Sequence, residues 1–148
     1  MPLRHRLAKI LPFALVGAAC GLVDSGPYFR YAAATNDCGP ADGPAVSIYL
    51  ASWRFQELKP PAPYIRLIVW QPRERLAGRS WSLAAGEAVA LRVQSQETDE
   101  RATSGSVVVD ALDDHGGIHG SAELWFSGGS HLTLSYDAAW ILSPMLCG

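Results

Sequence analysis

Three of the four histidines lie close together near the C-terminus, and they are the first residues to consider for metal or acid–base chemistry. They are His115, His119 and His131, and Asp113 and Asp114 precede the first of them. Imidazole and carboxylate groups gathered at one place could bind a metal ion. The strand pairing argued below puts His119 and His131 roughly 26 Å apart at about 3.3 Å per residue, so the two cannot share an ion. A weak cation site at His115 remains an alternative, but the spacing does not match a calcium-binding loop. We predict no metal site and no cofactor.

Signatures of nucleophilic or phosphate chemistry are missing from the sequence. It contains no Gly-x-Ser-x-Gly, His-Glu-x-x-His or Cys-x-x-Cys motif and no phosphate-binding loop. Glu123 and Asp137 are expected on one outer sheet face, where two carboxylates could act on a glycosidic bond. Solvated strand positions that keep a sheet soluble explain both more simply. No catalytic residue is predicted, and an enzyme is the least favoured class.

The five tryptophans carry the stronger signal. Trp81 and Trp140 fall in apolar patterns and are expected to pack in the core. Trp125 is expected on an outer face beside Thr133, where its ring could stack on a sugar or contact a protein partner. The alternative is that residues 53–63 cover such a face, because large exposed apolar patches are uncommon on monomers.

The first 19 residues have the order of a secretory signal peptide, with basic residues, an apolar run and then small residues. The stretch without a charge from Ile10 to Val23 has only 14 residues, whereas about 20 are needed to cross a bilayer. A membrane-spanning helix is therefore disfavoured. The basic residues of this segment are Arg4, Arg6 and Lys9.

The segment LVGAAC, which ends at Cys20, resembles a bacterial lipobox, in which the cysteine carries the lipid. It departs from that pattern at Gly17, where a leucine is usual. With three cysteines, an unmodified Cys20 would leave an odd thiol in an oxidising compartment. Lipidation of Cys20 would leave Cys38 and Cys147 to form one disulfide. The alternative to the disulfide is that Cys38 and Cys147 are two buried free thiols. The alternative to lipid anchoring is a soluble periplasmic or secreted protein.

The clearest structural pattern predicts a three-stranded antiparallel meander over residues 106–112, 118–126 and 131–141, with Gly-rich turns between the strands. Only the pairing of Phe126 with Leu132 makes a single apolar face, because a slip of one residue mixes apolar and polar positions. The other pairs of this register are Leu124 with Leu134, Ala122 with Tyr136, Gly120 with Ala138 and Ile118 with Trp140.

Four further strands are predicted, at residues 45–51, 64–70, 76–83 and 87–95. The strand at 64–70 is apolar on both faces, so we expect it to be central or covered. Residues 97–101 are expected to form a charged connection. The total of about seven strands predicts an all-β fold, an antiparallel β-sandwich or alternatively a small β-barrel. The expected division is a signal peptide at 1–19, a tether and irregular entry at 20–44 and the β-sandwich domain at 45–148.

The net charge of the chain without its signal peptide limits the classes of partner that it can bind. Loss of the signal peptide removes three of the 12 basic residues, which leaves nine against 14 acidic ones and a net charge near −5. Nucleic-acid binding normally needs a basic surface, so no nucleic-acid partner is predicted. Attachment to a membrane would come from an acyl chain on Cys20 rather than from charge.

The layout as a whole resembles small exported or lipid-anchored bacterial β-sandwich domains. The resemblance is carried by the signal that ends at Cys20, the CGPADGPAV entry from Cys38 to Val46, and the closing meander with Cys147-Gly148. It implies a location in the bacterial cell envelope and a fold class, and no activity. The function we predict is a lipid-anchored structural or interaction module; the alternative is a domain that binds a small molecule or a glycan, with Trp125 facing the ligand.

Overall fold

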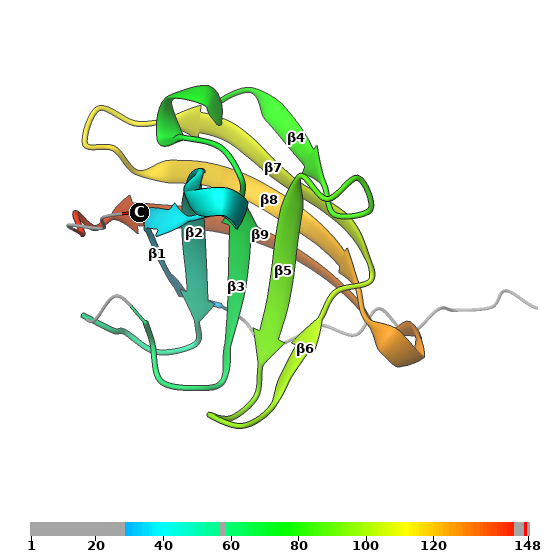
Figure 1. The fold of residues 1–148 in the computed structure, drawn as a ribbon. Helices are drawn as coiled ribbons and strands as arrows, with labels where there is room; N and C mark the ends of the chain where they lie inside the picture. The colour runs from blue at the N-terminus through cyan, green and yellow to red at the C-terminus, as the bar shows by residue number, and fades with distance from the viewer. Residues whose placement is uncertain (1–28, 57–58, 144–146, 148) are drawn as a thin grey trace, which may run out of the picture.

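The predicted all-β fold is confirmed in a computed structural model of the chain, which describes residues 29–56, 59–143 and 147 (Figure 1). Among these residues, the regular elements are strands and three short 3-10 turns. None of the helical segments in the described ranges has the length or the apolar character to span a membrane. The strands are β1 (Tyr31–Cys38), β2 (Pro44–Ala51), β3 (Tyr64–Val69), β4 (Arg79–Ser82), β5 (Ala88–Val93), β6 (Asp99–Arg101), β7 (Ser104–Leu112), β8 (Ile118–Trp125) and β9 (His131–Trp140). The 3-10 turns are Pro40–Asp42, Arg73–Arg75 and Ser127–Gly129.

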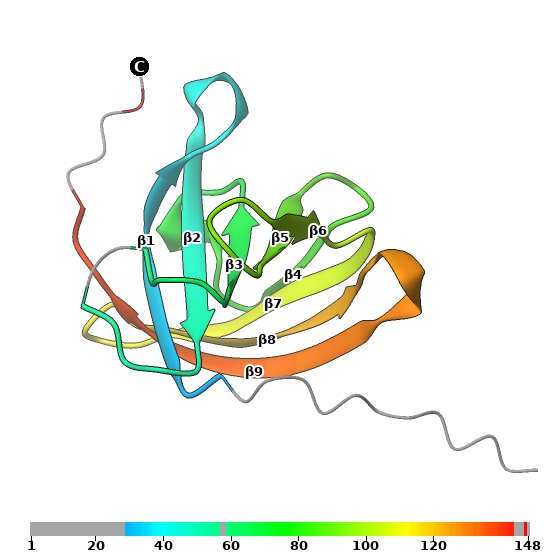
Figure 2. The ribbon, with the colours of Figure 1, turned by 90° about the horizontal axis from the view of Figure 1, so that it is seen from below.

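All nine strands belong to one sheet, in the order β4-β7-β8-β9-β1-β2-β3-β5-β6. The sheet is mixed rather than purely antiparallel as predicted, because β1 and β9 run parallel. Seen from below, β7, β8 and β9 form one curved layer, and β1 crosses β9 (Figure 2). The sheet bends at this junction so that one face of each half points inward.

The inward faces of both halves share one hydrophobic core. The first half contributes Ile48 from β2 and Leu67 from β3, and the second contributes Val107 from β7 and Leu124 from β8, all of them completely buried. Side chains from strands in opposite halves of the sheet order thus pack in one core, and this packing is the main source of stability.

The structure has two strands that the sequence did not predict. Residues 31–38 form β1 in the middle of the sheet, so the prediction of a tether over 20–44 is wrong for these residues. Their sequence, YAAATNDC, is buried on both faces at Ala33, Ala34 and Thr35 and therefore shows no alternation. Residues 99–101 form β6 on β5, within the stretch predicted to be only a connection.

The meander is present, with its predicted faces but not its predicted register. Leu124 lies opposite Leu132, and Gly120 lies opposite Tyr136, so the pairing is shifted by two residues from the predicted one. A shift of two keeps every side chain on its face, which is why polarity alone could not detect it. The tyrosine fits over the glycine and donates a hydrogen bond from its hydroxyl to the carbonyl of Val108 on β7, at 2.7 Å. Burial raises the pKa of this hydroxyl, which keeps it protonated as a donor.

Candidate functional site

The outer face of β8 and β9 carries a row of polar side chains that ends in one exposed aromatic ring. We call it the outer row. Because the two strands pair antiparallel, its residues lie opposite one another in twos. The pairs are His119 with Asp137, Ser121 with Ser135, Glu123 with Thr133 and Trp125 with His131.

Trp125 and His131 form a stacked pair at the end of the outer row. Their ring centroids are 4.4 Å apart with an angle of 21° between the planes. The Glu123 carboxylate lies 3.1 Å from His131 Nε2 and orients the imidazole. The predicted outward position of Trp125 is confirmed, since 37 % of its surface is exposed. An aromatic face beside a carboxylate and a hydroxyl is chemically suited to stack on a sugar ring.

The covering segment predicted as an alternative lies on a different part of the sheet. Trp53 and Phe55 pack against Tyr49 and Tyr64, so they cover the outer face of β2 and β3. The outer row on β8 and β9 keeps its exposure, with Glu123 and Trp125 both open to solvent.

At the other end of the outer row, His119 lies between two carboxylates. Its Nε2 is 3.3 Å from Asp113 and its Nδ1 is 3.2 Å from Asp137. The amides of Gly117 and His115 donate to Asp113, and with His119 they hold the pKa of that carboxyl below its usual value. Because the two carboxylates contact opposite sides of the ring, they do not converge on a common point. No cluster of His, Cys, Asp and Glu able to hold a metal ion is found in the described ranges.

The register also decides the distance between the two candidate carboxylates. His119 lies opposite Asp137 rather than Ala139, and Glu123 lies opposite Thr133. Asp137 is therefore four residues along β9 from the partner of Glu123, which is about 13 Å at ~3.3 Å per residue. Glycosidase pairs lie about 5–9.5 Å apart, so these two carboxylates do not form one.

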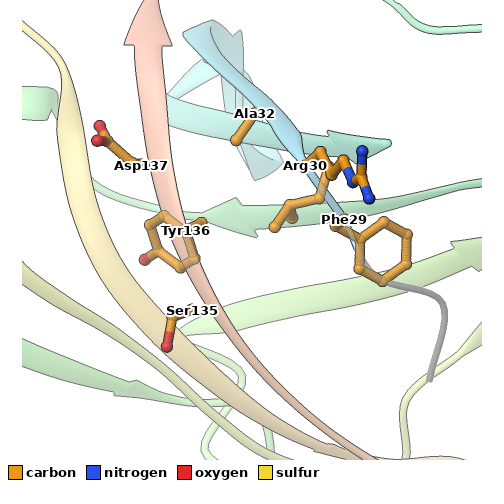
Figure 3. A pocket seen from close by; sticks show the side chains of 7 residues that line it. Phe29, Arg30, Ala32, Ser135, Tyr136 and Asp137 are labelled. Carbon is orange, nitrogen blue, oxygen red and sulfur yellow. The ribbon is translucent and has the colours of Figure 1, made fainter. Parts of the chain in front are cut away.

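A groove of about 750 Å³ lies where β1 and β9 separate (Figure 3). Phe29, Arg30 and Ala32 line it from the β1 side, Ser135, Tyr136 and Asp137 line it from β9, and Leu50 of β2 completes the lining. The groove thus joins a polar wall at the outer row to an apolar wall at the core.

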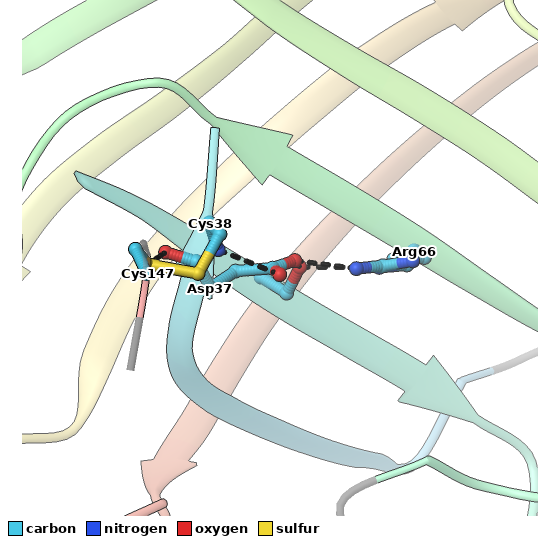
Figure 4. The surroundings of a disulfide bond; sticks show 5 residues. Asp37, Cys38, Arg66 and Cys147 are labelled. Atoms are coloured by element: carbon cyan, nitrogen blue, oxygen red, sulfur yellow. Dashed lines mark hydrogen bonds and ion pairs between the residues drawn. A yellow bond between two sulfur atoms is a disulfide. The ribbon is translucent and has the colours of Figure 1, made fainter. Parts of the chain in front are cut away.

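The predicted disulfide between Cys38 and Cys147 is present, with Cα atoms 5.6 Å apart (Figure 4). Asp37, beside it, accepts hydrogen bonds from the Cys38 amide at 2.8 Å, from the Ser47 hydroxyl and from the Arg66 guanidinium. Burial alone would raise the pKa of Asp37, but these donors and the charge of Arg66 outweigh it, so this pKa lies below its usual value. Arg66 also lies over the ring of Tyr49. This network joins β1, β2 and β3 on the covered side of the sheet.

Sequence reasoning missed the groove and the Asp37 network. For the network a signal was present, because Ser47 and Arg66 are polar residues in otherwise apolar strands, and a buried charge needs a partner. For the groove there was none. The predicted signal peptide and the predicted lipidation of Cys20 both fall outside the described residues. Comparisons with protein-family models, curated proteins and solved structures found no match to this chain, so the geometry alone carries its interpretation.

Proposed function

We propose that this protein is an exported domain of the bacterial cell envelope, anchored by an acyl chain on Cys20, that acts as a structural or interaction module. The observation that carries the proposal is the Cys38–Cys147 disulfide. Disulfides of this kind persist in oxidising compartments outside the cytoplasm. The bridge also uses two of the three cysteines, which leaves Cys20 as the one available for a lipid.

The core is filled by side chains, which favours an interaction role at the outer surface over a ligand site in the interior. We interpret the bent sheet as a β-sandwich rather than a barrel. Ile48, Leu67 and Leu124 are completely buried in the core between its two halves. Partners would then meet the outer surface. An envelope protein is the partner class we favour, and the net charge near −5 argues against nucleic acid.

Replacing Cys20 by serine should release the protein from membranes into the soluble envelope fraction, because the acyl chain would be its only anchor. The measurement is fractionation of cells that express the wild type or Cys20→Ser, with metabolic labelling by an alkyne-tagged fatty acid. Cys38→Ser is the matched control and should stay labelled and membrane-bound. A wild-type protein that is already soluble and begins at Cys20 with a free amine would refute lipidation.

A second candidate, glycan binding, is favoured by the stacked and exposed Trp125–His131 pair. If the ring of Trp125 holds a sugar, the protein should sediment with purified, insoluble cell-wall glycan, and Trp125→Ala should reduce the bound fraction at least fivefold. Ser121→Ala changes the same face away from the ring and should bind as the wild type does. Wild-type protein that stays in the supernatant at all glycan concentrations would eliminate this candidate.

A further inference from the structure

One side of β9 has no partner strand over most of its length. β9 pairs with β8 along His131–Ala138, whereas β1 pairs with it only at Ala138–Trp140. The residues from His131 to Asp137 therefore present a free edge on the side away from β8, at least toward the described parts of the chain. We call this stretch the β9 edge. It exists because β1 turns away to follow β2, to which Arg30 donates a backbone hydrogen bond at the Ala51 carbonyl.

The hydrogen bonds at both ends of β9 show which backbone groups face this edge. The Ser130 carbonyl accepts from Phe126 on the β8 side, and the Ile141 amide donates to Ala34 on the β1 side. Because successive residues of a strand direct their backbone groups to alternate sides, the odd-numbered residues face away from β8. The N–H and C=O groups of His131, Thr133 and Ser135 are thus directed toward the open edge, and so is the N–H of Asp137, whose carbonyl already faces Ala32 of β1 in the parallel pairing.

The two outermost strands of the sheet are protected, and the β9 edge is not. β4 has four residues and begins with Arg79, and β6 has three residues, all charged. Short, charged edge strands are a usual defence against unwanted pairing. The β9 edge has seven residues and contains no Lys, Arg or Pro. A long edge without such protection is what recognition by strand addition requires.

The walls of the groove define the side chains that an added strand should carry. Toward the core it would meet Tyr136, Leu50 and Phe29, which are apolar. Toward the outer row it would meet the carboxylate of Asp137, which lines the groove and is 80 % exposed. The Glu123 carboxylate, 51 % exposed, lies one strand further away on β8, opposite Thr133, within reach of a long basic side chain only. Side chains of a strand alternate between its faces, so a segment with alternating apolar and basic residues complements both walls.

We propose that the β9 edge binds an extended peptide segment of a partner protein as an additional strand, with apolar residues toward Tyr136 and basic residues toward Asp137 and Glu123. This inference deepens the proposed interaction role and rests on it. Backbone hydrogen bonds from His131, Thr133, Ser135 and Asp137 provide the affinity, and the alternating side chains provide the selectivity.

The test is a fluorescence-anisotropy titration of the full-length chain carrying Cys20→Ser with a labelled, end-blocked peptide, Val-Lys-Val-Lys-Val-Lys-Val. Ser135→Pro removes one edge N–H, and proline is tolerated on edge strands. Ser135→Ala keeps that N–H and is the matched control. We expect Ser135→Ala to bind as the parent does and Ser135→Pro to bind at least tenfold more weakly. A peptide with N-methylated backbone amides should not bind the parent protein, and one with Thr in place of Lys should bind at least threefold more weakly.

Three results would overturn the inference: no binding of the lysine peptide, equal binding by Ser135→Pro and Ser135→Ala, or equal binding of the N-methylated peptide. The last comparison needs no variant, so it decides even if Ser135→Pro fails to fold. Sedimentation of the peptide-free protein tests whether a second copy of this chain binds the β9 edge instead. A dimer that Ser135→Pro abolishes would assign the edge to that second copy. The location and anchoring of the protein are tested independently by Cys20→Ser, so failure here leaves that part of the proposed function standing.

Discussion

Replacing both Cys38 and Cys147 by alanine should lower the free energy of unfolding by about 3–5 kcal/mol, since a bridge across a long loop restricts the unfolded chain. The two residues are 109 positions apart. The corresponding decrease in melting temperature is roughly 10–20 °C for a domain of this size. The β signal in circular dichroism should persist below the transition, because the buried side chains of the core come from the strands and not from the bridge. Thermal unfolding of the Cys20→Ser protein with and without the two substitutions measures the difference.

Reduction and single substitution provide the controls for this prediction. Treatment of the unsubstituted protein with a reductant should give the same loss as the double substitution. Cys38→Ala and Cys147→Ala alone should each expose one free thiol and lose similar stability, since either change opens the same bridge. Unequal losses without a new thiol would instead indicate two separately buried cysteines.

Local pattern was sufficient to predict most of the strands. The alternation of Val46, Ile48 and Leu50 predicted β2. The doubly apolar sequence of β3 predicted a central or covered strand, and the structure places it between β2 and β5. The meander was predicted because its turns are rich in glycine and its strands alternate. These features depend on neighbours in the sequence, so the sequence alone displays them.

Features that depend on distant pairing were not predictable in the same way. β1 consists of small residues buried on both faces, and it is a strand because β2 and β9 pair with it on either side. The groove and the β9 edge follow from the parallel contact of β1 with β9. No local sequence pattern predicts that contact. For the candidate site, the outward face of Trp125 was predicted, but its stacking on His131 depends on the two-residue shift in register.

Gly120→Ala should be among the most damaging single substitutions in the half of the sheet that contains β7, β8 and β9. A Cβ at this position would lie 2.0 Å from the Val108 carbonyl oxygen and 2.6 Å from the Tyr136 hydroxyl. The carbonyl belongs to the backbone of β7 and cannot move without disturbing the pairing of β7 with β8. Overpacking of this kind costs about 1–3 kcal/mol, and loss of the Tyr136 hydrogen bond adds about 1 kcal/mol. We expect a total loss of about 2–4 kcal/mol in chemical denaturation.

Two other variants separate the contact of Gly120 with Tyr136 from its contact with the Val108 carbonyl. Gly43→Ala is the matched control, because its nearest neighbour would be the Pro40 carbonyl oxygen at 3.4 Å and its φ of −69° suits any residue. It should be neutral or stabilise by up to ~1 kcal/mol. Tyr136→Phe removes only the hydroxyl and should cost about 1 kcal/mol, with little rescue of Gly120→Ala because the Val108 carbonyl still blocks the Cβ. If Gly120→Ala were as harmless as Gly43→Ala, Gly120 could not lie beneath Tyr136. The register that sets His119 against Asp137 would then be wrong as well.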